Sequence, residues 1–94
     1  MYVISLTYKV ELSQMDEARP LHLEWLKKHY DSGLFIASGR QNPPVGGVII
    51  ANQIPRAELD ALLKTDPFAQ QNLAEYDIVE FEAKMTCNAL KGIA

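Results

Sequence analysis

Two histidines share one face of a predicted helix, and the first is the leading candidate for proton transfer. His22 lies in an apolar stripe with Trp25 and Leu26, at helical steps of three and four. An imidazole titrates near neutral pH, and partial burial tunes its pKa, so His22 is a candidate general acid or base. A core histidine with one satisfied hydrogen bond explains the same position. His29 lies nearer the helix end, where the dipole favours a cation, and we expect a structural role for it.

Asp66 and the segment 38–40 supply the other polar candidates. Asp66 precedes Pro67, which favours an extended backbone, and its carboxylate either caps the following helical turn or points inward. Ser38 is placed to donate a hydrogen bond to a substrate. Gly39 permits close backbone approach to a ligand, and Arg40 is suited to hold an anion. A strand end that needs a flexible corner accounts equally well for Gly39 and Arg40.

Metal-dependent and nucleophilic chemistry have little support in the sequence. Along a helix, His22 and His29 are separated by roughly 10 Å of rise, too far to share one ion without further ligands. No serine or cysteine lies in a recognisable nucleophile turn. The single cysteine, Cys87, is expected to be an incidental thiol near the chain end. We therefore expect no metal and no cofactor.

Hydrophobic periodicity predicts the elements that position these residues. Residues 2–10 alternate and predict a strand, whereas 16–30 follow a helical period. Ser13 or Asp16 is the expected N-cap, and Pro20 fits only in or near the first turn, so the regular helix is expected to run from about Pro20. Gly33 is expected to end it.

The remainder of the chain predicts two more strands, a second helix and a last strand. The further predicted elements are strands at 34–38 and 47–51, a helix at 55–64, a short helical turn at 69–73 and a strand at 76–84. Two prolines between the second and third strands indicate a turn. Residues 85–94 show no clear period and are interpreted as a tail or a partner-dependent segment.

This order predicts an α+β, ferredoxin-like βαββαβ domain with an antiparallel sheet and both helices on one face. A chain of 94 residues has room for one domain, spanning 1–94, with its core at about 2–84. The residues of the other face, which are Val3, Ser5, Val79 and Phe81 or the residues that alternate with them, are too apolar to be left in water. Two sheets packed back to back, as in a dimeric α+β barrel, would cover it. We therefore expect a homodimer, and a monomer with an exposed sheet face is the less favoured alternative.

Charge and hydropathy exclude two classes of partner. The formal net charge is -3, and the 9 Lys and Arg residues are scattered along the chain. Nucleic-acid binding requires a concentrated positive face, so we expect none. No apolar run approaches the roughly 18 residues of a membrane span, and the amino terminus lacks the basic start of a signal peptide. We expect a cytoplasmic protein with no membrane partner.

Four sequence blocks, in order, resemble the YCII-related (YciI-like) family. They are Arg19-Pro20-Leu21-His22-Leu23, Gly33-Leu34-Phe35-Ile36-Ala37-Ser38-Gly39, Gly46-Gly47-Val48-Ile49-Ile50-Ala51 and Thr65-Asp66-Pro67-Phe68. The resemblance implies a ferredoxin-like subunit that dimerises into an α+β barrel, with an active site centred on a histidine and an aspartate. By motif position these are His22 and Asp66, and the family's Ser-Gly falls on Ser38 and Gly39. Arg40 departs from the proline that many relatives have there.

The resemblance raises a His22–Asp66 dyad to the leading hypothesis. A carboxylate fixes the imidazole tautomer and favours the imidazolium, so the pair can act as a general base. The candidate substrate-binding residues are Arg19, Trp25, Ser38, Gly39, Arg40 and Phe68, with Tyr8 as a further aromatic neighbour.

Three functions remain open on the sequence alone. One is a cofactor-independent enzyme with a lyase, isomerase or dehydrohalogenase-like step on a small aromatic or anionic substrate. The second is a non-catalytic small-molecule-binding or accessory protein. In the third, His22 and Asp66 form a structural hydrogen bond and have no role in binding or catalysis.

Overall fold

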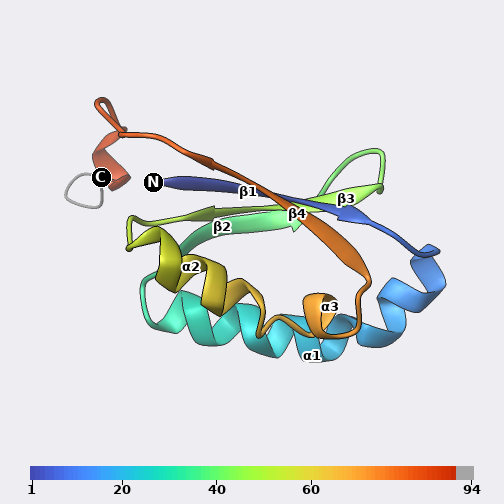
Figure 1. Cartoon of the computed structure of the whole chain (residues 1–94). Coiled ribbons are helices and arrows are strands. Elements are labelled where there is room, and N and C mark those ends of the chain that lie inside the picture. Colours follow the sequence, from blue (N-terminus) through green and yellow to red (C-terminus); the bar gives the residue numbers. More distant parts are fainter. Residues whose placement is uncertain (91–94) are drawn as a thin grey trace.

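The chain folds into a four-stranded antiparallel sheet with its α-helices on one face (Figure 1). The structure is a computed structural model that describes residues 1–90. Its strands are β1 (Tyr2–Tyr8), β2 (Phe35–Arg40), β3 (Gly46–Ala51) and β4 (Ala74–Glu80), in the order β2-β3-β1-β4, and its helices are α1 (Leu12–Asp31), α2 (Arg56–Leu63) and α3 (Pro67–Gln70), followed by a 3-10 turn, η1 (Asn88–Leu90). The predicted α+β, ferredoxin-like fold is confirmed.

Alternation along β1 places the core between the sheet and the helices. Tyr2, Ile4 and Leu6 are buried, because period-two alternation turns them all to the helix side. In the antiparallel register Leu6 lies opposite Tyr76 of β4. Residues paired across a ladder share a face, so Tyr76 also points toward the helices. This register determines which β4 side chain can reach the layer that contains His22 and Asp66.

The opposite face of the sheet carries no covering element in Figure 1. Val3 pairs with Ile50 of β3 and with Val79 of β4, so the three side chains share this face. Val79 is 60% exposed, and Phe81, just beyond β4, is 41% exposed. A shallow hollow of about 250 Å³ lies over β2 and β3 and includes Val48 and Ile50. An apolar sheet face is thus open in the single chain.

Helix α1 begins eight residues before Pro20, so the prediction of a regular helix from about Pro20 is wrong. Its N-cap is Glu11, without a side-chain cap, so the expected caps at Ser13 and Asp16 are wrong as well. Pro20 lacks an N–H and removes one hydrogen bond inside the helix. Burial of Met15 and Ala18 against the core holds the turns before it. Gly33 follows the helix with φ +83°, as predicted for a residue that ends it.

Strand and turn boundaries shift by a few residues from the predicted ones. β2 runs on to Arg40, so Arg40 belongs to the strand. α3 begins at Pro67, two residues before the predicted turn. β4 ends at Glu80, which pairs with Tyr2 at the start of β1. The predicted strand at 76–84 is therefore wrong for its last four residues.

The segment after β4 leaves the sheet. Met85 is 93% exposed, and Cys87 is a free, exposed cysteine. The last four residues of the predicted tail at 85–94 lie outside the described residues. Within the described part of the chain, no helix combines the length and the apolar character needed to cross a membrane.

Candidate active site

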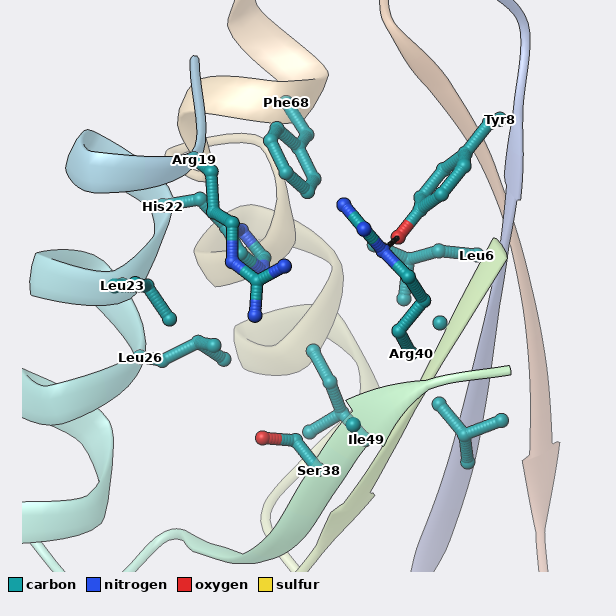
Figure 2. Close-up of a pocket in the computed structure, with 13 residues that line it drawn as sticks. Leu6, Tyr8, Arg19, His22, Leu23, Leu26, Ser38, Arg40, Ile49 and Phe68 are labelled. Atoms are coloured by element: carbon teal, nitrogen blue, oxygen red, sulfur yellow. Dashed lines mark hydrogen bonds between the residues drawn. The ribbon is translucent and has the colours of Figure 1, made fainter. Parts of the chain in front are cut away.

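A cavity of about 150 Å³ lies between α1 and the sheet, and α3 contributes to its wall (Figure 2). Its apolar lining includes Leu6, Leu26 and Ile49, which come from β1, α1 and β3. An apolar cavity of roughly this volume accommodates one benzene ring. The polar groups that line it are on Tyr8, Arg19, His22, Ser38 and Arg40. A small ring compound with polar substituents therefore fits its size and lining.

His22 lies in the wall of this cavity with one ring nitrogen engaged. The residue is 9% exposed, and its Nδ1 lies 2.7 Å from Oδ1 of Asp66. Its ring stacks on Phe68, with the centroids 3.9 Å apart and the planes 8° apart. Within residues 1–90, Nε2 of His22 has no hydrogen-bond partner. Every fully buried side-chain nitrogen or oxygen atom in this range does have a partner, so Nε2 is not one of the fully buried atoms. The second ring nitrogen is thus open to a ligand or to water.

Asp66 is fully buried, and three groups from three elements contact its carboxylate. Besides His22 from α1, the backbone N–H of Phe68 donates to Oδ1 at 3.0 Å, and the hydroxyl of Tyr76 from β4 donates to Oδ2 at 2.5 Å. The sequence left capping and an inward-pointing carboxylate as alternatives. The structure shows both, because Asp66 is the N-cap of α3 and also faces His22.

These contacts determine what the His22 ring can do. An ionised carboxylate only accepts hydrogen bonds, so beside Asp66 the neutral imidazole carries its proton on Nδ1. Its lone pair is then on Nε2, the nitrogen without a partner in residues 1–90. Burial and the Asp66 charge raise the pKa of Tyr76, which keeps its hydroxyl protonated as a donor. The arrangement can accept a proton at Nε2 and stabilise the resulting imidazolium.

Two arginines reach the cavity from different elements. Figure 2 shows Arg19 entering from α1 and Arg40 from β2. Arg40 donates to Oδ1 of Asp16 at 2.9 Å and to the Tyr8 hydroxyl at 3.4 Å, and these hydrogen bonds raise its pKa. Arg19 has no ion pair with any residue of the described range. The cavity entrance therefore carries positive charge, of which Asp16 offsets a part.

The other predicted binding residues fall into two groups. Ser38 and Gly39 line the cavity, and the hydroxyl of Ser38 is 2.6 Å from that of Tyr30. Phe68 lines it as well. Trp25 does not, because its indole is buried behind His22 and donates through Nε1 to Thr65 at 2.9 Å. The structure therefore brings five of the six predicted binding residues to the cavity and leaves Trp25 behind it.

His29 lies outside this cavity, among aromatic rings. Its ring is 5.0 Å from that of Trp25 and 5.2 Å from that of Phe35, centroid to centroid. Burial and the neighbouring Lys28 charge lower its pKa, which opposes the helix-dipole effect expected from its position. Within the part of the chain that the structure describes, no three His, Cys, Asp or Glu side chains are grouped so as to hold a metal ion.

The sequence did not predict that the hydroxyl of Tyr76 donates a hydrogen bond to Asp66. The Tyr76 neighbours Ile78 and Glu80 share its parity in the predicted strand, which points it to one face. Contact with Asp66 depends on the β1–β4 register and on where α3 is docked, and no local pattern encodes either. Asp16, now paired with Arg40 near the cavity, was considered only as a cap.

The fold and the site together define a ferredoxin-like α+β domain with a histidine–aspartate pair beside a small cavity. The sequence matches the YCII-related domain over residues 1–82, and the chain belongs to this family. A similar solved structure is 5-chloro-2-hydroxyhydroquinone dehydrochlorinase (TftG) from Burkholderia phenoliruptrix AC1100, in complex with 2,5-dihydroxybenzoquinone. It has a TM-score of 0.72 and 14% identity, over 87% of this chain and 94% of that chain. At this identity the likeness shows the fold. No curated protein matches the chain.

Proposed function

We propose that this protein is a cofactor-independent enzyme in which His22, oriented by Asp66, acts as a general base and acid on a small substrate. The observation that carries the proposal is the 2.7 Å contact between His22 Nδ1 and the buried Asp66 carboxylate, beside a cavity that His22 lines. The contact leaves Nε2 as the atom that exchanges a proton with the substrate.

The reaction class is a lyase, isomerase or dehydrohalogenase-like step. His22 Nε2 takes the proton of a C–H bond next to a carbonyl group, and the electron pair of that bond forms a new double bond. In an elimination, a leaving group such as halide departs with the electrons of its own bond to carbon. In an isomerisation, the imidazolium returns the proton to another atom of the same substrate. Neither route requires an oxidant or reductant.

The cavity favours a ring substrate with negatively charged oxygen. Its volume of about 150 Å³ suits one ring, and Phe68 offers an aromatic surface. Arg19 and Arg40 provide charge-assisted donors for a phenolate, an enolate or a carboxylate. The dehydrochlorinase TftG, which shares the fold, was solved with a dihydroxybenzoquinone, and this supports the same substrate class.

The proposed functional unit is a homodimer in which two sheets face each other. The open apolar face around Val3, Ile50 and Val79 supports this arrangement, because a contiguous exposed apolar patch on a small protein marks an interaction site. A second copy of the same sheet offers a complementary apolar surface.

The test is a turnover screen with small phenols, aromatic acids, lactones and chlorinated hydroquinones, read by mass spectrometry and by halide release. For any compound that is converted, we expect His22→Ala to lower kcat at least about 100-fold, the usual contribution of a positioned acid or base. His29→Gln is the matched control, since His29 does not line the cavity, and it should keep wild-type turnover.

Two outcomes would contradict the proposal. Undiminished turnover by His22→Ala would remove the histidine from the mechanism. A compound that binds near His22 and is recovered unaltered after long incubation would instead support the alternative, a non-catalytic binding protein. Nuclear magnetic resonance of the His22 ring locates such binding independently of any reaction.

A further inference from the structure

Tyr76 is the third donor on the Asp66 carboxylate, and it comes from an element that contributes nothing to the cavity lining. We propose that Tyr76 is a positioning residue that sets the proton affinity of His22 through Asp66. This inference rests on the proposed function, in which His22 exchanges protons with the substrate. It assigns a role to a β4 side chain that does not line the cavity.

The geometry gives each carboxylate oxygen its own set of donors. Oδ1 accepts from His22 Nδ1 at 2.7 Å and from the Phe68 N–H at 3.0 Å, whereas Oδ2 accepts from the Tyr76 hydroxyl at 2.5 Å. Asp66 is 0% exposed, so water does not take the place of a missing donor without rearrangement. Tyr76 is therefore the single donor that the structure gives to Oδ2 within residues 1–90.

Charged and polar groups reach the cavity and the dyad from α1, α3, β1, β2 and β4, whereas β3 lines the cavity with apolar residues. Arg19 of α1 and Arg40 of β2 line the cavity with guanidinium groups, and Tyr8 of β1 contributes a hydroxyl that accepts from Arg40. From α3 the dyad receives a backbone N–H, and from β4 the Tyr76 hydroxyl. Of these groups only Tyr76 and the Phe68 N–H contact Asp66, and only the tyrosine is removable by substitution.

The sign of the effect follows from which state the hydroxyl stabilises more. When His22 is neutral, the carboxylate carries an uncompensated charge, and donation from Tyr76 offsets that charge. When His22 is protonated, the imidazolium already compensates Asp66, so the same donor contributes less. Tyr76 therefore favours the neutral, proton-accepting form of His22. Its removal should raise the pH at which His22 loses its proton.

The experiment is a titration of the His22 ring by nuclear magnetic resonance, with isotopically labelled histidine and no substrate. In Tyr76→Phe we expect the His22 midpoint to move upward by about 0.5 pH unit or more. Tyr2→Phe is the matched control, because it removes a phenolic hydroxyl from the same sheet, one that bonds Ile54 and Gln53 and not the dyad. Its His22 midpoint should equal that of the wild type.

A second substitution keeps the test decisive if Tyr76→Phe is poorly folded. Replacement of Tyr76 by 3-fluorotyrosine keeps the ring and makes the hydroxyl a stronger donor, so the His22 midpoint should move downward. An unchanged midpoint in a folded variant of either kind would overturn the inference. The titration needs no turnover, so it is separate from the proposed function, which His22→Ala tests. In an active enzyme, the pH limb of kcat should shift with the midpoint.

Discussion

At the scale of single residues, the site combines a fully buried carboxylate with guanidinium groups at the cavity. Burial of a charged group is costly unless hydrogen bonds compensate it, and Asp66 has three donors. Arg40 differs, because it is exposed and its partner Asp16 lies on the surface of α1. An anionic ligand would compete with Asp16 for this guanidinium. In the proposed function, Arg40 therefore contributes to the recognition of an anionic ligand, whereas Asp66 orients His22.

Arg40→Ala is the residue-scale prediction. For an anionic ring compound that binds the cavity, such as 2,5-dihydroxybenzoquinone, we expect roughly fivefold weaker binding, because a charge-assisted hydrogen bond at an exposed site contributes about 1 kcal/mol. The loss should shrink as salt is added. Isothermal titration calorimetry at two salt concentrations measures both effects.

The control for this prediction is Arg56→Ala. Arg56 pairs with Asp60 on the surface of α2, so its removal changes the net charge by the same amount away from the cavity. Equal weakening by the two variants would mean that Arg40 acts only through overall charge and not as a ligand.

At the scale of elements, the cavity depends on how closely β1 and β3 approach each other. Gly46 begins β3, and a Cβ atom there would lie 1.8 Å from the carbonyl oxygen of Leu6. No side chain fits without moving the backbone of β1. Since Leu6 and Ile49 line the cavity, the glycine supports the site indirectly.

We expect Gly46→Ala to lower the free energy of unfolding by about 3 kcal/mol, because the clash is with backbone that has no room to yield. Urea denaturation measures the loss. The matched control is Gly39→Ala in β2, where a Cβ would have no atom within 4 Å, and its stability should stay within about 0.5 kcal/mol of the wild type. Equal stability of the two variants would contradict the close approach of β1 and β3.

The elements also show how far sequence reasoning reaches. Alternation and helical period predicted the type and order of every main element, since side chains of one face must share the core. They missed the first turns of α1, because Pro20 was weighed as a helix breaker without the burial of Met15 and Ala18 that offsets it. Such burial is a tertiary effect, and no local pattern contains it.

The candidate site could be predicted only in part, because some of its contacts also depend on tertiary structure. His22 was singled out because a titratable group on an apolar stripe is unusual, and the family motifs paired it with Asp66. The structure places the two side chains 2.7 Å apart. Trp25 was predicted to contact the substrate but does not line the cavity. Helical periodicity places Trp25 on the buried face of α1, but it does not show which residues of that face border a cavity. Tyr76 required the β4 register, which emerges only when the sheet assembles.

At the scale of the whole molecule, the open apolar sheet face is the feature that favours the proposed homodimer. An antiparallel sheet can leave one face in water when that face is polar, but here the open face carries apolar side chains, and Val79 is 60% exposed. A domain of this size buries only about 60 to 68% of its unfolded surface, so a second copy would add burial that one chain lacks.

Val79→Asp should shift the protein toward monomer, because a buried charge at the centre of a sheet-to-sheet contact is unfavourable. Light scattering coupled to size exclusion, at micromolar concentration, measures the mass. Leu21→Asp is the control, since Leu21 is 54% exposed on α1, among the helices and away from the open face. A wild-type chain that runs as a stable monomer would contradict the homodimer.

The position of Asp66 has a consequence for how this site tolerates change. The same carboxylate starts α3 and fixes the imidazole, and α3 carries Phe68, the ring on which that imidazole stacks. Loss of the carboxylate therefore removes the hydrogen-bond partner of His22 and, at the same time, the N-cap of the helix that carries Phe68. A variant at His22 removes one donor from the buried carboxylate and one ring from the stack on Phe68, whereas a variant at Asp66 also removes the N-cap of α3. If the proposed function holds, a substitution at position 66 affects both the start of α3 and the orientation of the base, because one side chain makes both contacts.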